Sequence, residues 1–105
     1  MRKTIHTVLG EINASEIGTV LAHEHIICVS HALKIGFGDK WFHTREVIDA
    51  AVQALKQVKI DCGVDTIIDG TPLNLGRNVP MLQEISRRSG VHILLSTGLY
   101  YTEDY

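Results

Sequence analysis

Two histidines separated by one residue, His23 and His25, are the side chains of this sequence that are best placed for chemistry. They lie in an apolar segment, residues 19–27, which we predict to be a β-strand. Side chains two residues apart on a strand point to the same face, so the two imidazoles would lie close together on a rigid support. Because imidazole is the commonest side-chain ligand of metal ions, the pair predicts a site for one divalent ion.

Other interpretations of this segment stay open. Glu24 would point to the opposite face, into the layer between the sheet and the helices, so we do not expect it to bind the same ion. The pair can also be two ordinary hydrogen-bonded or exposed histidines, since zinc sites usually need three or four protein ligands. A local site that adds Cys28 and His31 is a further alternative, although we expect Cys28 to be a small buried residue.

The elements that must position this strand follow one another as alternating strands and helices. Apolar residues dominate the three expected strands, and the two expected helices carry apolar side chains at three-to-four spacing. This order predicts right-handed parallel βαβ units, and it fits both a doubly wound sheet and a (β/α)8 barrel. The expected elements are a hairpin over 4–9 and 11–13, strands over 19–27, 64–69 and 91–96, and helices over 44–62 and 78–89.

Capping residues set the expected helix boundaries. Thr44 would begin the first helix as its N-cap, and Gly63 would end it in a left-handed conformation. Asn78 and Gly90 have the same two roles in the second helix.

Two further features of the expected fold concern its surface. Residues 28–43 lack a clean period, and we predict a long loop there with a short helical turn near residues 32–35. No helix follows the strand over 91–96, so its outer edge would stay open. An open edge favours pairing with another chain and therefore a homo-oligomer.

Polar and aromatic side chains follow the second and third strands. Asp69 and Thr71 end the second strand, and Tyr100 and Tyr101 come just after the third. Sites in parallel α/β folds lie beyond the carboxyl ends of the strands, so these residues would share one rim with the histidines. Asp69 followed by Gly70 is also a common turn dipeptide, and the tyrosines can simply cover an edge of the core.

The composition excludes several classes of partner. The net charge is -2 with acidic and basic residues interspersed, which gives no basic face for nucleic acid or an anionic membrane. No apolar run approaches the roughly 18 residues of a membrane span, and no apolar secretory segment follows the basic start of the chain. We therefore expect a cytoplasmic protein whose two cysteines, Cys28 and Cys62, are reduced thiols.

Four stretches of the sequence resemble the N-terminal part of the phosphotriesterase-related family in the amidohydrolase superfamily. The resemblance covers nearly the whole chain, although the segment 28–43 matches little. It is specific because the His-Glu-His strand occurs together with a Gly-Arg-Asn stretch and a Thr-Gly-Leu-Tyr stretch. The four stretches are Thr7–Gly10, Ile17–His25, Thr66–Asp69 with Leu75–Asn78, and Ser96–Tyr101.

The resemblance implies a (β/α)8 barrel that uses two divalent ions, usually zinc, to activate a bridging hydroxide. It implies that His23 and His25 bind the more buried ion and that Tyr100 or Tyr101 lines the substrate pocket. Family members act on phosphotriesters or lactones, so the implied substrate is a small ester or lactone. A tyrosine after the third strand is more similar to the lactonase-like branch.

The chain differs from the family in lacking the later strands. In the family those strands supply a carboxylated bridging lysine, two more histidines and an aspartate, and a barrel needs about 250 residues. We therefore expect residues 1–105 to be a single domain, the N-terminal part of a metal-dependent hydrolase. It would hold no catalytic residue of its own and have no activity in isolation. The alternative is a small non-catalytic α/β module that binds one structural metal ion or a partner chain.

Overall fold

The computed structural model describes residues 3–98 of the chain, so Tyr100 and Tyr101 lie outside the described residues. The chain forms an N-terminal hairpin and then alternates strands with helices, as predicted. The strands are β1 (Thr4–Thr7), β2 (Gly10–Asn13), β3 (Thr19–Glu24), β4 (Val64–Asp69) and β5 (His92–Leu95). The helices are α1 (His31–Phe37), α2 (Asp39–Phe42), α3 (Thr44–Cys62) and α4 (Val79–Ser89), with short 3-10 helices η1 (Ala14–Glu16) and η2 (Leu73–Leu75).

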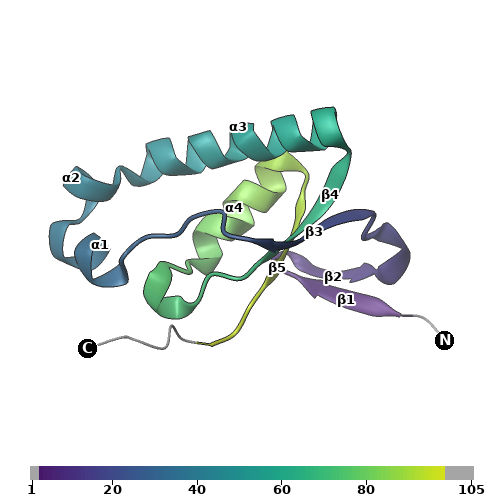
Figure 1. The fold of residues 1–105 in the computed structure, drawn as a ribbon, viewed down its shortest axis with the longest axis horizontal. Coiled ribbons are helices and arrows are strands. Elements are labelled where there is room, and N and C mark those ends of the chain that lie inside the picture. Colours follow the sequence, from purple (N-terminus) through teal and green to yellow (C-terminus); the bar gives the residue numbers. More distant parts are fainter. Residues whose placement is uncertain (1–2, 99–105) are drawn as a thin grey trace.

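Strands β3, β4 and β5 form a parallel sheet in that order, which confirms the predicted βαβ arrangement. Thr66 of β4 is aligned with Val20 of β3 and with His92 of β5. The antiparallel pair of β1 and β2 lies at the end of the molecule opposite α1 and α2 (Figure 1). Because the three parallel strands share one direction, their carboxyl ends meet at the same edge of the sheet.

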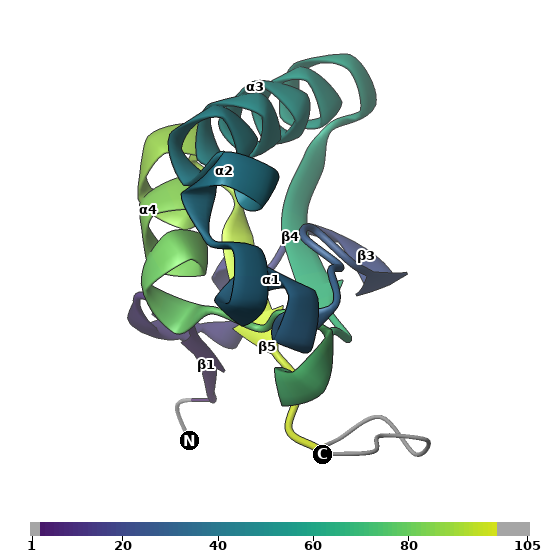
Figure 2. The ribbon, with the colours of Figure 1, turned by 90° about the vertical axis from the view of Figure 1, so that its left-hand side faces the viewer.

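Helices α3 and α4 pack together and cover one face of this sheet (Figure 2). Apolar side chains at helical spacing from both helices meet inward side chains of β4 and β5. Within residues 3–98, no helix is both long enough and apolar enough to span a membrane. The buried core contains Val8, Phe42, Ile48, Val52, Leu55, Val64, Ile67, Met81, Leu82, Ile85, Val91 and Ile93.

The helix boundaries confirm three of the four capping predictions. The side chain of Asn78 accepts a hydrogen bond from the first turn of α4 at 3.1 Å. Gly63 and Gly90 end the two long helices with left-handed φ angles of 67° and 76°. The expectation for Thr44 is wrong, because His43 precedes α3 in a left-handed conformation (φ 41°). Thr44 is the first helical residue, and its hydroxyl donates to an aspartate of α2 instead of capping α3.

The segment 28–43 is more regular than predicted, because it contains α1 and α2 in place of a long loop with one turn. Ser30 caps α1 by accepting a backbone N–H bond at 3.3 Å, and Gly38 separates the two helices with a φ angle of 62°. Both helices expose apolar side chains, such as Ile35 (71%) and Phe37 (63%) of α1. Because neither helix has an apolar stripe on one side alone, no helical period could be detected in this segment.

The two outer strands of the sheet differ from expectation in their exposure. β3 ends at Glu24, whose side chain is exposed instead of lying between the sheet and the helices. The reason is that β3 is an edge strand, paired with β4 alone in the part of the chain that the structure describes. The edge of β5 is partly covered, since the Val8 amide of the hairpin turn donates to the Ile93 carbonyl at 2.8 Å. Among the described residues, both outer strands are therefore edges of the sheet, and the edge that we expected to be open at the third parallel strand is covered in part by the hairpin turn.

Candidate metal centre

The two histidine rings lie close together at the carboxyl end of β3. Their centroids are 5.4 Å apart and their planes meet at 68°, which is an edge-to-face arrangement. His23 belongs to the strand, and His25 is the first residue after it. Both residues are exposed. The rings therefore lie on one side of the chain, as their spacing predicts.

Gly70, which directly follows β4, lies against both rings. A Cβ atom placed on Gly70 would lie 3.5 Å from Cε1 of His25 and 3.7 Å from Nε2 of His23. Both imidazoles thus converge on one small volume that the glycine leaves free. The Gly70 amide donates to the Glu24 carbonyl at 2.9 Å, which fixes this loop against the end of β3.

One ring nitrogen of His25 is engaged by a buried threonine. Its Nδ1 lies 3.0 Å from Oγ1 of Thr71, a residue with 1% exposure. Engagement of Nδ1 leaves Nε2 as the ring nitrogen that is available to a ligand. Metal-binding histidines usually carry such a hydrogen bond on the nitrogen that does not bind the ion.

A buried carboxylate joins the ends of two strands beside the rings. Asp69 is 2% exposed, and its Oδ1 accepts from the Thr71 amide at 2.8 Å while its Oδ2 accepts from the Ile26 amide at 3.2 Å. The first bond closes a turn over Gly70, which confirms the turn interpretation of this dipeptide. The second bond ties β4 to the chain directly after His25. Asp69 therefore acts on the site through the backbone, because both its oxygens are bonded inside the protein.

Ser96 and Arg77 extend this network to β5, although the sequence patterns assigned a role to neither side chain. The Ser96 hydroxyl donates to the Thr71 carbonyl at 3.2 Å, and the Ser96 amide donates to the Asp69 carbonyl at 3.1 Å. Arg77 donates from Nη1 to the Ser96 carbonyl at 2.8 Å. The sequence signal for Arg77 was its place in the Gly-Arg-Asn stretch. Hydrogen bonds thus connect all three strand ends at one rim.

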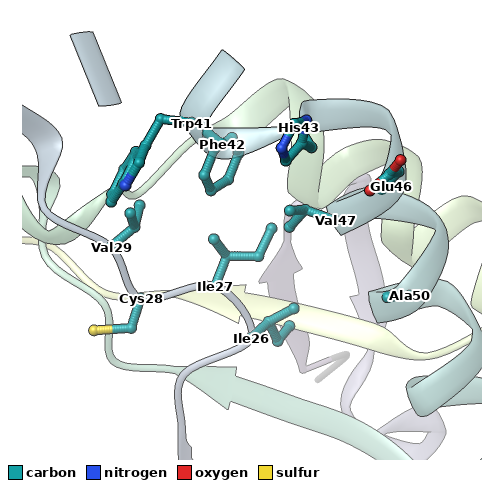
Figure 3. Close-up of a pocket in the computed structure, with 10 residues that line it drawn as sticks. All are labelled: Ile26, Ile27, Cys28, Val29, Trp41, Phe42, His43, Glu46, Val47 and Ala50. Atoms are coloured by element: carbon teal, nitrogen blue, oxygen red, sulfur yellow. The ribbon is translucent and has the colours of Figure 1, made fainter. Parts of the chain in front are cut away.

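Among the described residues, the two histidines are the predicted metal ligands, and they do not make a complete set. Cys28 and Cys62 are free thiols, but Cys28 is exposed and not buried as expected. Its sulfur points away from the apolar cavity that lies between the segment after β3 and the start of α3 (Figure 3). Across residues 3–98, no group of three His, Cys, Asp or Glu side chains is arranged to hold an ion, so the local site with Cys28 and His31 is wrong. The two imidazoles over Gly70 fit one part of a zinc site, because zinc accepts imidazole nitrogen.

An apolar cavity of about 580 Å³ lies between the segment after β3 and the start of α3 (Figure 3). Neither His23 nor His25 lines this cavity, so it is separate from the histidine pair. Its walls are formed by Ile26, Ile27, Cys28, Val29, Trp41, Phe42, His43, Glu46, Val47 and Ala50.

The fold and the rim together define a class of protein. Three parallel strands joined by α3 and α4, with polar residues gathered at their carboxyl ends, form one section of a (β/α)8 barrel. The solved structure of the phosphotriesterase from Mycobacterium tuberculosis has the same arrangement. It matches with a TM-score of 0.87 and 28% sequence identity, over 98% of this chain and 32% of that chain.

Residues 3–105 match the model of the phosphotriesterase family, and the chain belongs to this family. An aryldialkylphosphatase from Saccharolobus solfataricus is 30% identical over 91 residues, which cover 85% of this chain and 28% of the relative. A phospho-furanose lactonase from Mycoplasmopsis agalactiae is 31% identical over 107 residues, which cover 98% of this chain and 29% of the relative. The chain therefore spans roughly a third of the length of the relatives that it matches.

Proposed function

We propose that this chain contributes the first metal ligands of a hydrolase that cleaves small phosphotriesters or lactones. His23 and His25 bind one divalent ion, which we propose to be zinc. The convergence of the two rings over Gly70 is the observation that carries this proposal. The substrate classes rest on the relatives, one of which is named an aryldialkylphosphatase and another a phospho-furanose lactonase.

The residues of the chain have defined tasks in such a site. A divalent ion bound at this rim lowers the pKa of a bound water toward neutrality and polarises the ester oxygen. Thr71 engages Nδ1 of His25, and Asp69 holds the ends of β3 and β4 together. Tyr100 and Tyr101 are proposed to contact the substrate. We assign no nucleophile or general base within residues 3–98.

The two imidazoles are fewer ligands than a catalytic zinc site usually has, since such sites use three protein ligands and a water. We therefore propose that residues 1–105 act as a single domain that supplies part of the ligand set and has no hydrolase activity in isolation. Purified chain supplied with zinc should hydrolyse neither a chromogenic aryl dialkyl phosphate nor a lactone faster than zinc alone. Turnover that His23→Ala abolishes would contradict this part of the proposal.

Zinc titration followed by NMR of the histidine rings tests the metal site. We expect zinc to shift the ring signals of His23 and His25 together and to leave those of His6 and His92 unchanged. His6 is a suitable control, because its side chain is 84% exposed and pairs with Glu11 in the hairpin. His23→Ala should remove the response of His25, whereas His6→Ala should not. A response that is absent, or shared by all exposed histidines, would show that no site exists at the pair.

A homo-oligomer is our proposal for the state of the chain in solution. Within the described residues, β3 pairs on one side alone, and an unpaired strand edge is a surface on which another copy can add. Light scattering should give a mass above the 11.7 kDa of one chain. A monomer at every concentration would contradict this proposal and leave the metal site unaffected.

A further inference from the structure

We propose that Thr71 is the positioning residue that determines which nitrogen of His25 faces the metal ion. Its hydroxyl engages Nδ1 of the imidazole, and in the arrangement that we propose the hydroxyl accepts from Nδ1–H, so that Nε2 keeps its lone pair for the ion. The inference rests on the proposed function, because it concerns a proposed metal ligand. It extends that function by assigning the control of His25 to a residue 46 positions away in the sequence.

The hydroxyl of Thr71 is held more firmly than the ring that it contacts. Thr71 is 1% exposed, whereas His25 is exposed. The Thr71 amide donates to Oδ1 of Asp69 at 2.8 Å, and its carbonyl accepts from the Ser96 hydroxyl at 3.2 Å. The backbone of Thr71 is therefore bonded on both sides, to the end of β4 and to the residue that follows β5. Because Thr71 is buried and its backbone is bonded on both sides, the position of its hydroxyl determines where Nδ1 of His25 is held.

The choice of nitrogen follows from the protonation of the imidazole. A neutral ring carries a single N–H, and only its other nitrogen has a lone pair for an ion. Oγ1 of Thr71 lies 3.0 Å from Nδ1, and a threonine hydroxyl can accept from Nδ1–H or donate to an unprotonated Nδ1. We assign the first form here, because it is the one that leaves the lone pair of Nε2 for an ion. The opposite tautomer would carry its hydrogen on Nε2 and exclude the ion. Loss of an outer hydrogen bond of this kind typically weakens metal binding about 10-fold to 100-fold.

Nitrogen-15 NMR of the His25 ring in the metal-free chain reports this tautomer directly. At about pH 8.5 imidazoles are neutral, so the spectra separate the two tautomers without a contribution from the charged form. We expect the Nδ1–H form to predominate in the wild-type chain. Thr71→Val keeps the shape of the side chain but removes the hydroxyl, so the population should move toward the Nε2–H form. Thr71→Ser should restore the wild-type spectrum.

Thr66→Val is the matched control for the loss of a buried threonine hydroxyl. Thr66 is 0% exposed, and its hydroxyl donates to the Ile17 carbonyl at 2.6 Å near the start of β4. We expect this variant to leave the His25 tautomer unchanged. If Thr66→Val and Thr71→Val change the tautomer equally, general loosening of the fold explains the result and the positioning role is overturned.

Zinc affinity separates this inference from the proposed function. Thr71→Val should bind zinc about 10-fold or more weakly than the wild-type chain, and Thr71→Ser should bind it equally well. If zinc binds to His23 and His25 but neither affinity nor tautomer changes in Thr71→Val, the positioning role alone is wrong. If the tautomer depends on Thr71 but the wild-type chain binds no zinc at the pair, the metal site is wrong and the metal role of Thr71 is overturned with it.

Discussion

Oδ2 of Asp69 accepts the backbone amide of Ile26 at 3.2 Å, across 43 positions of sequence. This bond joins the ends of β3 and β4 beside the histidine pair. Ile26 directly follows His25, so the bond fixes the backbone position from which the His25 side chain extends. The same carboxylate accepts from the amide of Thr71, whose hydroxyl contacts His25. One buried side chain therefore sets both the backbone and the side-chain position of this proposed ligand.

Removal of this carboxylate should destabilise the fold. Asp69→Ala leaves two amide donors without their acceptor, and a hydrogen bond to a charged group contributes about 1.5–3 kcal/mol. We expect the free energy of unfolding, measured with urea, to fall by about 3 kcal/mol. Asp69→Asn keeps one acceptor oxygen and should lose less. Asp61→Ala, at an exposed position near the end of α3, should change stability by at most about 0.5 kcal/mol. If the Asp69→Ala chain is as stable as this control, the Asp69 carboxylate does not stabilise the junction between the ends of β3 and β4.

The size of the side chain at position 70 should control the spacing of the histidine rings. An alanine Cβ would meet His25 and His23 at 3.5 and 3.7 Å, which are ordinary contacts, so Gly70→Ala should leave both rings in place. Gly70→Val adds two methyl groups to the same volume and should push the rings apart. We expect the ring-to-ring NOE to weaken and zinc affinity to fall on the order of 10-fold, or about 1.4 kcal/mol, in the valine variant alone. Equal zinc affinity in all three chains would show that the ion does not bind in this volume.

Local sequence signals were sufficient for most of the fold. The boundaries of the long helices depend on hydrogen bonds between residues only a few positions apart, at Asn78, Gly63 and Gly90. Such bonds can be predicted from the residue type. The alternation of strands and helices led directly to the parallel order of the sheet. His23 and His25 lie together because the geometry of a strand places them there.

Contacts between distant residues could not be predicted in the same way. The bond between His25 and Thr71 spans 46 positions, and no period or motif in the sequence encodes it. The exposure of β3 depends on what lies beside its edge, which its apolar composition does not report. The helical turn expected near residues 32–35 lies within α1, but the full length of this helix was not predicted, because Ile35 and Phe37 face solvent and leave it without a core-facing stripe.

Gly18 should not tolerate a side chain. Its φ angle is +63°, and a Cβ atom would collide with Oδ2 of Asp65, the oxygen that accepts the Thr19 amide at 3.0 Å. Gly18→Ala therefore combines backbone strain with the loss of a bond at the start of β3. We expect the free energy of unfolding, from urea titration, to fall by about 2–4 kcal/mol.

Gly36→Ala provides a comparison of opposite sign. Gly36 lies within α1, its φ angle is not positive, and no atom lies within 4 Å of a Cβ placed there. Alanine lowers the conformational freedom of the unfolded chain, so this variant should be more stable by about 0.5–1 kcal/mol. If the alanine variants at Gly18 and Gly36 change stability in the same direction, the steric argument for Gly18 is wrong.

The ion network between α3 and α4 should make stability depend on pH in the acid range. Arg45 and Arg88 both donate to the carboxylate of Glu84, and these hydrogen bonds, with Arg45 contributing most, hold the pKa of Glu84 below its usual value. A carboxyl group whose pKa is lowered by folding stabilises the protein above its unfolded pKa. This contribution is lost as the pH falls through the folded pKa. Because unfolded glutamate titrates near pH 4.3, the loss should occur below about pH 4.

Glu84→Gln should reveal this dependence in urea denaturation. The variant should have a lower denaturation midpoint than the wild-type chain at about pH 7, and the difference should shrink below about pH 4, where the wild-type carboxyl gains its proton. About 1 M salt should also reduce the difference at neutral pH, since charges at the surface are then screened beyond about 3 Å. A difference that stays constant across this pH range and does not respond to salt would mean that Glu84 stabilises the helix pair by packing and not by its charge.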